Sequence, residues 1–228
     1  MSTATKQERS LKFKSPLELV TFVDDEILSG EMKLHKWQAQ IMTDFAKPSN
    51  DKDPFRSVVR AANGSGKDKY IIAPCAVWLG TVFDDSLCII TSASGNQLDR
   101  QTDRYIQQLM NGINRLFDQQ IWKINYRHYT NMLNGSTIEL FATDEPGRAE
   151  GWHPAVANGQ FGIFVSEAKS ISDDIFTALA RCTGFTKRID VSSPGLPDGH
   201  FYNACVGNSW KQYHVTAFDC PHLSQDYI

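Results

Sequence analysis

The fold of this chain is decided by the stretch Arg60-Ala61-Ala62-Asn63-Gly64-Ser65-Gly66-Lys67-Asp68. It follows the apolar pair Val58-Val59 and precedes the run Tyr70-Ile71-Ile72, an order that predicts a strand, a tight loop and a helix. Glycines let successive backbone N–H groups face an anion at a helix N-terminus, and a lysine at the end of the loop reaches the β- and γ-phosphates of a nucleotide. We therefore predict a phosphate-binding loop whose cation is Lys67.

Two positions of this loop depart from the usual pattern. The pattern opens on Gly and ends in Ser or Thr, whose hydroxyl ligates Mg²⁺, whereas this chain has Ala61 and Asp68 there. A plain glycine-rich turn is the alternative interpretation. The residues assigned to nucleotide binding in the loop are Ala62, Asn63, Gly64, Ser65, Gly66, Lys67 and Asp68.

An apolar run over residues 161–165 ends in the polar pair Ser166 and Glu167. P-loop enzymes usually end this strand in Asp, which holds Mg²⁺, and in many ATPases a Glu follows that polarises the attacking water. Glu167 keeps the second role, but Ser166 stands where Asp is usual. Because hydroxyl and carboxylate have exchanged places between the two motifs, we expect Asp68 and Ser166 to converge on one Mg²⁺ ion. The alternative is a decayed site that does not hydrolyse nucleotide.

Composition limits the remaining possibilities. The chain has 228 residues and a mass of 25.6 kDa, which is enough for one sizeable α/β core. Its net charge of −3 argues against a protein that coats DNA by bulk charge. No apolar run approaches the ~20 residues of a membrane span, so a cytosolic location is expected. The five cysteines are odd in number and scattered, which predicts reduced thiols rather than disulfides or a zinc site.

Two helices are expected before the loop. Ser15-Pro16-Leu17-Glu18 predicts a capped helix that runs to about residue 28, and residues 34–42 form a second amphipathic pattern. In the second helix, the Gln38 amide matches the hydrogen-bonding edge of adenine, and Trp37 can shelter the ring. The alternative for this pair is a core tryptophan beside a surface glutamine.

After the loop, strands and helices alternate. Strands are expected at 87–91, 161–165, 188–191 and 212–217, helices up to residue 117 and at 172–182, and a hairpin of 122–127 with 137–141. The polar loop 144–155 contains Arg148, which is a candidate to approach a γ-phosphate. This order predicts an α/β fold with a mostly parallel sheet covered by helices on both faces.

Taken together, the motifs resemble the ATPase domain of phage large terminases from about residue 34 onward. The resemblance rests on Trp37-Gln38, the loop through Lys67-Asp68, residues 91–97, Gly151-Trp152-His153, Val165-Ser166-Glu167-Ala168 and Ser192-Ser193-Pro194-Gly195. It implies a P-loop fold of the RecA-like type, with Gln38 for adenine, Lys67 for phosphates and Glu167 for water. It also implies that Ser192 and Ser193 couple hydrolysis to movement. Arg148 resembles the family's basic residue near the γ-phosphate, with Arg60 as the competing position.

The resemblance also implies three parts and a set of partners. We expect a flexible arm at 1–14, a helical lobe with the adenine element at 15–50, and an ATPase core at 51–228 that ends before a nuclease domain. No acidic cluster for a nuclease is found, so cleavage of DNA is not expected. The implied cofactors are ATP and Mg²⁺. The implied partners are double-stranded DNA, the portal protein and the small terminase subunit, with a ring on the capsid, a possible monomer in isolation, and the host cytoplasm as location. A helicase-like translocase and a non-hydrolysing nucleotide-binding module are the alternatives.

Overall fold

The computed structural model describes residues 12–27, 34–143, 146–154, 156–157 and 159–223. Their centre is an eight-stranded sheet with the order β3-β4-β5-β2-β6-β7-β1-β8. Its strands are β1 (Phe55–Ala61), β2 (Leu87–Ser92), β3 (Trp122–Asn125), β4 (His128–Asn131), β5 (Thr137–Ala142), β6 (Phe161–Ser166), β7 (Lys187–Ser192) and β8 (Lys211–Val215). All neighbours from β5 to β8 in this order are parallel, while β3 and β4 form an antiparallel end. The predicted mostly parallel sheet is confirmed.

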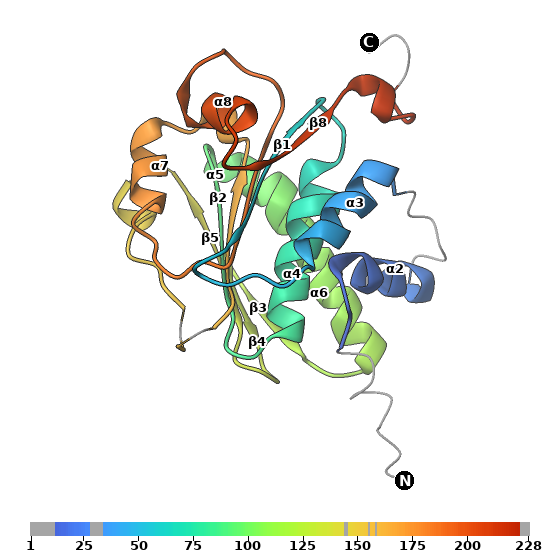
Figure 1. Ribbon diagram of the computed structural model, residues 1–228. Helices are drawn as coiled ribbons and strands as arrows, with labels where there is room; N and C mark the ends of the chain where they lie inside the picture. Colours follow the sequence, from blue (N-terminus) through green and yellow to red (C-terminus); the bar gives the residue numbers. More distant parts are fainter. Residues whose placement is uncertain (1–11, 28–33, 144–145, 155, 158, 224–228) are drawn as a thin grey trace.

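Helices cover both faces of the sheet (Figure 1). One face carries α2 (Pro16–Ile27), α3 (Lys36–Phe45), α4 (Ala73–Val82) and α6 (Arg104–Phe117). The other carries α7 (Asp173–Leu179) and α8 (Gly199–Val206). Every residue of β2, β6 and β7 is buried, which explains why β2 and β6 have nearly continuous apolar sequences rather than alternating ones.

The two N-terminal helices share the main hydrophobic core. Leu19 of α2 and Ile41 of α3 are fully buried with residues of α4 and α6. Phe13 is also buried, and its carbonyl accepts a hydrogen bond from the Trp78 indole N–H at 2.8 Å. The C-terminal end of the arm predicted for residues 1–14 therefore packs onto the core. Residues 1–11 lie outside the described part of the chain. The domain boundaries at 14 and 50 stay a prediction.

The antiparallel end of the sheet differs from the expected hairpin. Residues 122–125 pair with β4, not with β5, and β4 then pairs with β5. The reversal between β3 and β4 uses Tyr126 and Arg127, and Arg127 has φ +56°. Gly135, with φ +75°, makes the second reversal. The four-residue strand β4 escaped prediction because two of its residues are polar and half-buried, so no apolar run marks it.

Other boundaries shift by a few residues. The helix expected at 172–182 ends at Leu179, and the strand expected at 212–217 ends at Val215. The end of the first helix, expected near Gly30, lies outside the described residues. All five cysteines are free thiols, as predicted.

Two features are absent from the described residues. In those parts of the chain, no helix combines the length and apolar character needed to cross a membrane. The same residues contain no group of three or more His, Cys, Asp or Glu side chains placed to hold a metal ion.

Candidate nucleotide-binding site

The phosphate loop connects β1 to the helical turn η1 (Asp68–Ile72), which continues into α4. Gly64 and Gly66 have φ values of +72° and +80°, a left-handed backbone that glycine adopts without steric cost. A Cβ atom on Gly66 would lie only 2.6 Å from the Tyr70 ring. The shape of the loop thus requires both glycines.

Lys67 lies inside this loop and is only 5% exposed. Its ammonium donates to the Ala62 carbonyl at 3.2 Å and to the Ala61 carbonyl at 3.5 Å. Burial lowers the pKa of Lys67 below its ordinary value, while the nearby carboxylates of Glu167 and Asp68 act in the opposite direction. A buried ammonium whose acceptors are neutral carbonyls is suited to bind a phosphate. The negative charge of the phosphate would stabilise the protonated lysine, which burial disfavours.

Asp68 and Ser166 meet as the sequence predicted. The Ser166 hydroxyl donates to Asp68 Oδ1 at 2.7 Å, and both side chains are buried. Thr102 donates to the same oxygen at 2.6 Å. Sequence reasoning missed Thr102, although its position between the exposed Arg100 and Arg104 places it on the inward face of that helical turn.

This group of oxygens fits Mg²⁺. One carboxylate and two hydroxyls are hard donors, and Mg²⁺ is bound by few protein oxygens while it keeps several waters. The hydroxyls of Ser65 and Ser92 are also buried and have no hydrogen-bond partner among the described residues. Ser92 stands beside Ser166 in the pairing of β2 with β6. The carboxyl edge of the sheet therefore carries polar groups that a bound ion, phosphate or water would satisfy.

Glu167 follows β6 directly and has φ +50°, an uncommon conformation for a residue with a Cβ atom. Its carboxylate accepts a hydrogen bond from Ser192 at 3.4 Å, so the residue after β6 is in contact with the end of β7. Backbone strain of this kind often occurs at functional sites, where the surrounding structure holds it. Here it turns the half-buried carboxylate toward the cleft that Lys67 also lines.

We call the part of the site formed by Lys67, Asp68, Ser166 and Glu167 the phosphate side. The base side is formed by the start of α3 and by residues 220–223 of the C-terminal segment. On the base side, Gln38 is fully buried: its amide nitrogen donates to the Ser65 carbonyl at 3.0 Å, and its amide oxygen accepts from the His35 backbone at 2.8 Å. Gln38 therefore links α3 to the phosphate loop in this structure, and its adenine contact stays a prediction.

The C-terminal segment contributes an unexpected residue, His222. Its ring stacks on His35 at a centroid distance of 4.9 Å, with a 2.9 Å contact between His35 Nε2 and His222 Nδ1. His222 Nε2 lies 2.9 Å from the Gly64 carbonyl. His35 in turn stacks on Trp37 at 6.5 Å. No short-range pattern links position 222 to the loop, so only the fold reveals this contact.

These groups border one cleft of about 600 Å³. Of the predicted residues, those that line it are Asn63, Gly64, Gly66, Lys67, Asp68, Glu167 and Ser193. Residues that the sequence did not predict also line it, namely Lys69, Tyr70, Gln97, Gln101, Tyr105, Lys169 and His222. Six other predicted residues do not line the cleft, namely Trp37, Gln38, Ala62, Ser65, Ser166 and Ser192. Arg148 is exposed in the turn η3 (Pro146–Arg148) and does not line this cleft, nor does Arg60 of β1.

The strand β1, the glycine loop with its buried lysine, and β6, which ends beside that loop, define an α/β fold of the P-loop type. Solved structures of other proteins have a similar fold. The large terminase of a thermophilic bacteriophage, solved with ADP, matches with a TM-score of 0.65 at 15% identity, over 86% of this chain and 48% of that one. This chain therefore spans about half the length of that terminase.

Two further structures agree. The ATPase domain of the Thermus phage P74-26 large terminase matches with a TM-score of 0.59 at 15% identity, over 82% of this chain and 83% of that domain. The large terminase of bacteriophage HK97 gives a TM-score of 0.54 at 14% identity, over 71% of this chain and 33% of that one. The chain thus has the fold of a phage large terminase ATPase domain. No protein-family model and no curated protein sequence matches it.

Proposed function

We propose that this chain is an ATP-hydrolysing motor domain that couples hydrolysis to the movement of double-stranded DNA into a phage capsid. The observation that carries the proposal is the single cleft that Lys67, Asp68 and Glu167 line, with Ser193 at its border. Terminases of the same fold have been solved with ADP and with ATP-gamma-S, which supports a nucleotide as the ligand.

Each residue of the phosphate side has a role in this proposal. Lys67 would exchange its carbonyl partners for the phosphates, and Asp68 with Ser166 would hold Mg²⁺. The ion, when bound, neutralises charge on the phosphate oxygens. Glu167 orients a water molecule and accepts its proton. Ser192 and Ser193, which follow from the end of β7, transmit the change to the next segment.

The base side and the loop around η3 complete the proposed site. Trp37 and Gln38 are proposed to contact adenine. Arg148 is exposed, so it would reach a nucleotide through a movement of its loop or from a neighbouring copy of the chain. Arginine fingers supplied by neighbours contribute about 10³–10⁵ in rate. We therefore propose assembly as a ring on the portal, with the small terminase subunit as partner, in the host cytoplasm, and slow hydrolysis by the isolated chain.

Steady-state ATP hydrolysis with Glu167→Gln tests the proposal. The amide keeps the shape of the side chain but cannot accept a proton, so turnover should fall about 10²–10⁴-fold while ATP binding is retained. Glu139→Gln is the matched control, since Glu139 lies on β5 and does not line the cleft. Unchanged turnover by the Glu167→Gln protein would assign the base elsewhere.

One observation favours a second function, a nucleotide-binding module that does not hydrolyse. Asp68 Oδ1 already accepts two hydroxyl hydrogen bonds, which is an arrangement that a purely structural carboxylate would also adopt. In that case the wild-type chain binds ATP but has no measurable turnover at any protein concentration.

A further inference from the structure

Lys169 connects the end of β6 to the residues that follow β7. It lies in the short turn η4 (Ala168–Ser170), two residues after Glu167. Its backbone N–H donates to the Ser192 hydroxyl at 3.3 Å. Its ammonium donates to the Ser193 hydroxyl at 2.6 Å and to the Pro194 carbonyl at 3.1 Å. The backbone N–H and the side chain of Lys169 thus hold Ser192 and Ser193, the two residues that the resemblance assigns to coupling.

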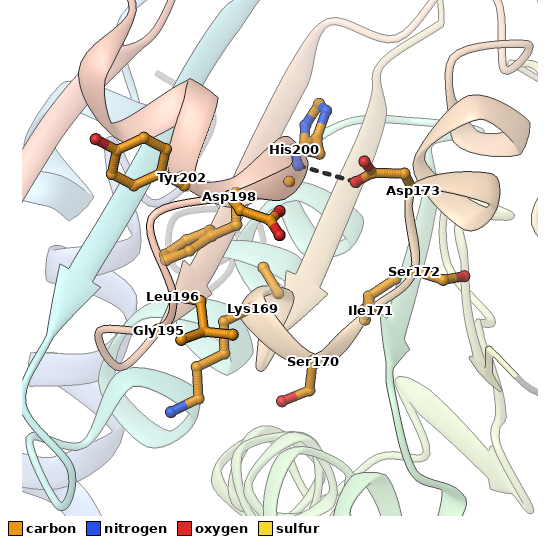
Figure 2. A pocket seen from close by; sticks show the side chains of 13 residues that line it. Lys169, Ser170, Ile171, Ser172, Asp173, Gly195, Leu196, Asp198, His200 and Tyr202 are labelled. Atoms are coloured by element: carbon orange, nitrogen blue, oxygen red, sulfur yellow. Dashed lines mark hydrogen bonds between the residues drawn. The ribbon is translucent and has the colours of Figure 1, made fainter.

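The stem of Lys169 also lies against the coupling segment, which we define as residues 193–198. A Cβ atom built on Gly195 would lie 3.1 Å from Lys169 Cβ and 3.2 Å from its Cδ. Only glycine permits this approach without a shift of the lysine. Figure 2 shows Lys169 beside Gly195 and Leu196, at the border of a second cleft of about 460 Å³.

Lys169 belongs to both clefts. It lines the nucleotide cleft with Lys67 and Glu167, and it lines the second cleft with Leu196 and Asp198 of the coupling segment. Its charge is close enough to Lys67 to disfavour the protonated form of that residue. A second cation therefore stands beside the phosphate-binding lysine, and its present acceptors are a neutral hydroxyl and a neutral carbonyl.

We propose that Lys169 senses the γ-phosphate and positions the coupling segment according to the nucleotide that is bound. This inference rests on the proposed function. In this structure, the ammonium holds Ser193 and Pro194. A γ-phosphate is a charged acceptor and forms stronger hydrogen bonds than a neutral one, and the flexible four-carbon stem lets the ammonium change partner. ATP then releases the coupling segment, whereas ADP, which lacks the γ-phosphate, leaves it held.

The test compares Lys169→Met, which keeps the length of the stem and removes the charge, with Lys169→Arg, which keeps the charge. Affinities for ATPγS and ADP are measured by calorimetry, and the backbone amide NMR signals of Gly195 and Leu196 are followed with each nucleotide. In the wild-type chain, ATPγS should shift both signals and ADP should not. Lys169→Met should lose at least about tenfold in affinity for ATPγS relative to ADP, with signals displaced already without nucleotide and insensitive to ATPγS. Lys169→Arg should retain part of both responses.

Lys69→Met is the matched control. Lys69 lines the same cleft, but its ammonium lies over the Tyr70 ring, 4.9 Å from the centroid, and not on the coupling segment. This variant should lower the affinities for ATPγS and ADP by a similar factor and keep the response of Gly195 and Leu196. Wild-type behaviour of Lys169→Met in both measurements would overturn the inference while leaving the proposed function intact. If the wild-type chain binds no nucleotide, both are wrong.

Discussion

On the phosphate side of the cleft, Ser166 and Glu167 lie at the end of β6, and Asp68 follows the loop after β1, whereas on the base side the contacts come from the start of α3 and from residues 220–223. The phosphate side uses hydrogen bonds between buried side chains that lie where strands end. The base side combines the fully buried Gln38, which donates to the loop backbone, with the stacked rings of His35 and His222, which are not buried. Under the proposed function, the groups for phosphate chemistry lie at the end of β6 and in the loop after β1, whereas the base would be recognised by side chains of α3 and of the C-terminal segment.

The largest effect is expected from Lys67→Ala on the phosphate side. Its removal deletes a charged hydrogen bond to the phosphates, so ATP affinity should fall by about 1.5–3 kcal/mol, or roughly 10–100-fold. Calorimetry measures the change, with Lys123→Ala on the exposed surface of β3 as control. Affinity within a factor of about two of the wild-type value would contradict the role of Lys67.

Gln38→Ala tests the base side. Gln38 is fully buried with both ends of its amide bonded, so its loss should lower the free energy of unfolding by about 1–3 kcal/mol in urea. Gln40→Ala, on the exposed side of the same helix, should cost only about 0.5 kcal/mol.

The ratio of ATP to GTP affinity in the Gln38→Ala variant tests the adenine contact. If Gln38 reads adenine, this ratio falls. If the side chain serves only to hold Ser65, both affinities change together.

A double-mutant cycle on Asp68 and Ser166 sharpens the account of the phosphate side. Asp68→Ser leaves only hydroxyls near the ion, and Ser166→Asp adds a second carboxylate beside the triphosphate, so each change should weaken Mg-ATP binding or hydrolysis. The double variant restores the common arrangement and should recover much of the loss, with a coupling energy above the ~0.5 kcal/mol of independent sites. The four proteins are assayed across a Mg²⁺ titration, and simple additivity would refute the exchange of roles.

The smallest effect concerns the contact between His35 and His222. Burial, and then the charge of His222, lower the pKa of His35 below its ordinary value of 6.5, so the folded state favours the neutral ring. The stabilisation from this group is therefore present above about pH 6.5 and is lost as pH falls through the lower folded-state pKa. The backbone amides of Cys220, His222 and Leu223 should lose protection against hydrogen exchange at acidic pH, beyond the intrinsic pH trend of exchange. The His222→Ala variant should show fast exchange with no such extra dependence.

The Asp68–Ser166 pair shows how much of the site a sequence can predict. Each residue belongs to a local motif with known spacing, and the parallel order of the strands brings the carboxyl ends of β1 and β6 to one edge, so their contact followed from the motifs. Thr102 and Lys169 had no such motif. Thr102 lies in a helical turn between two exposed arginines, Arg100 and Arg104. Lys169 lies in a three-residue turn with no periodic pattern.

The sequence alone determined the local order of elements and the phosphate loop, because hydrophobic periodicity, glycine and capping residues act over a few positions. The tertiary structure decided the pairing of β3 with β4, the position of His222 beside Gly64, and the bonds from Lys169 to Ser193 and Pro194. These contacts join residues up to 158 positions apart. Their geometry depends on how the helices and strands pack against the sheet, which short-range patterns do not encode.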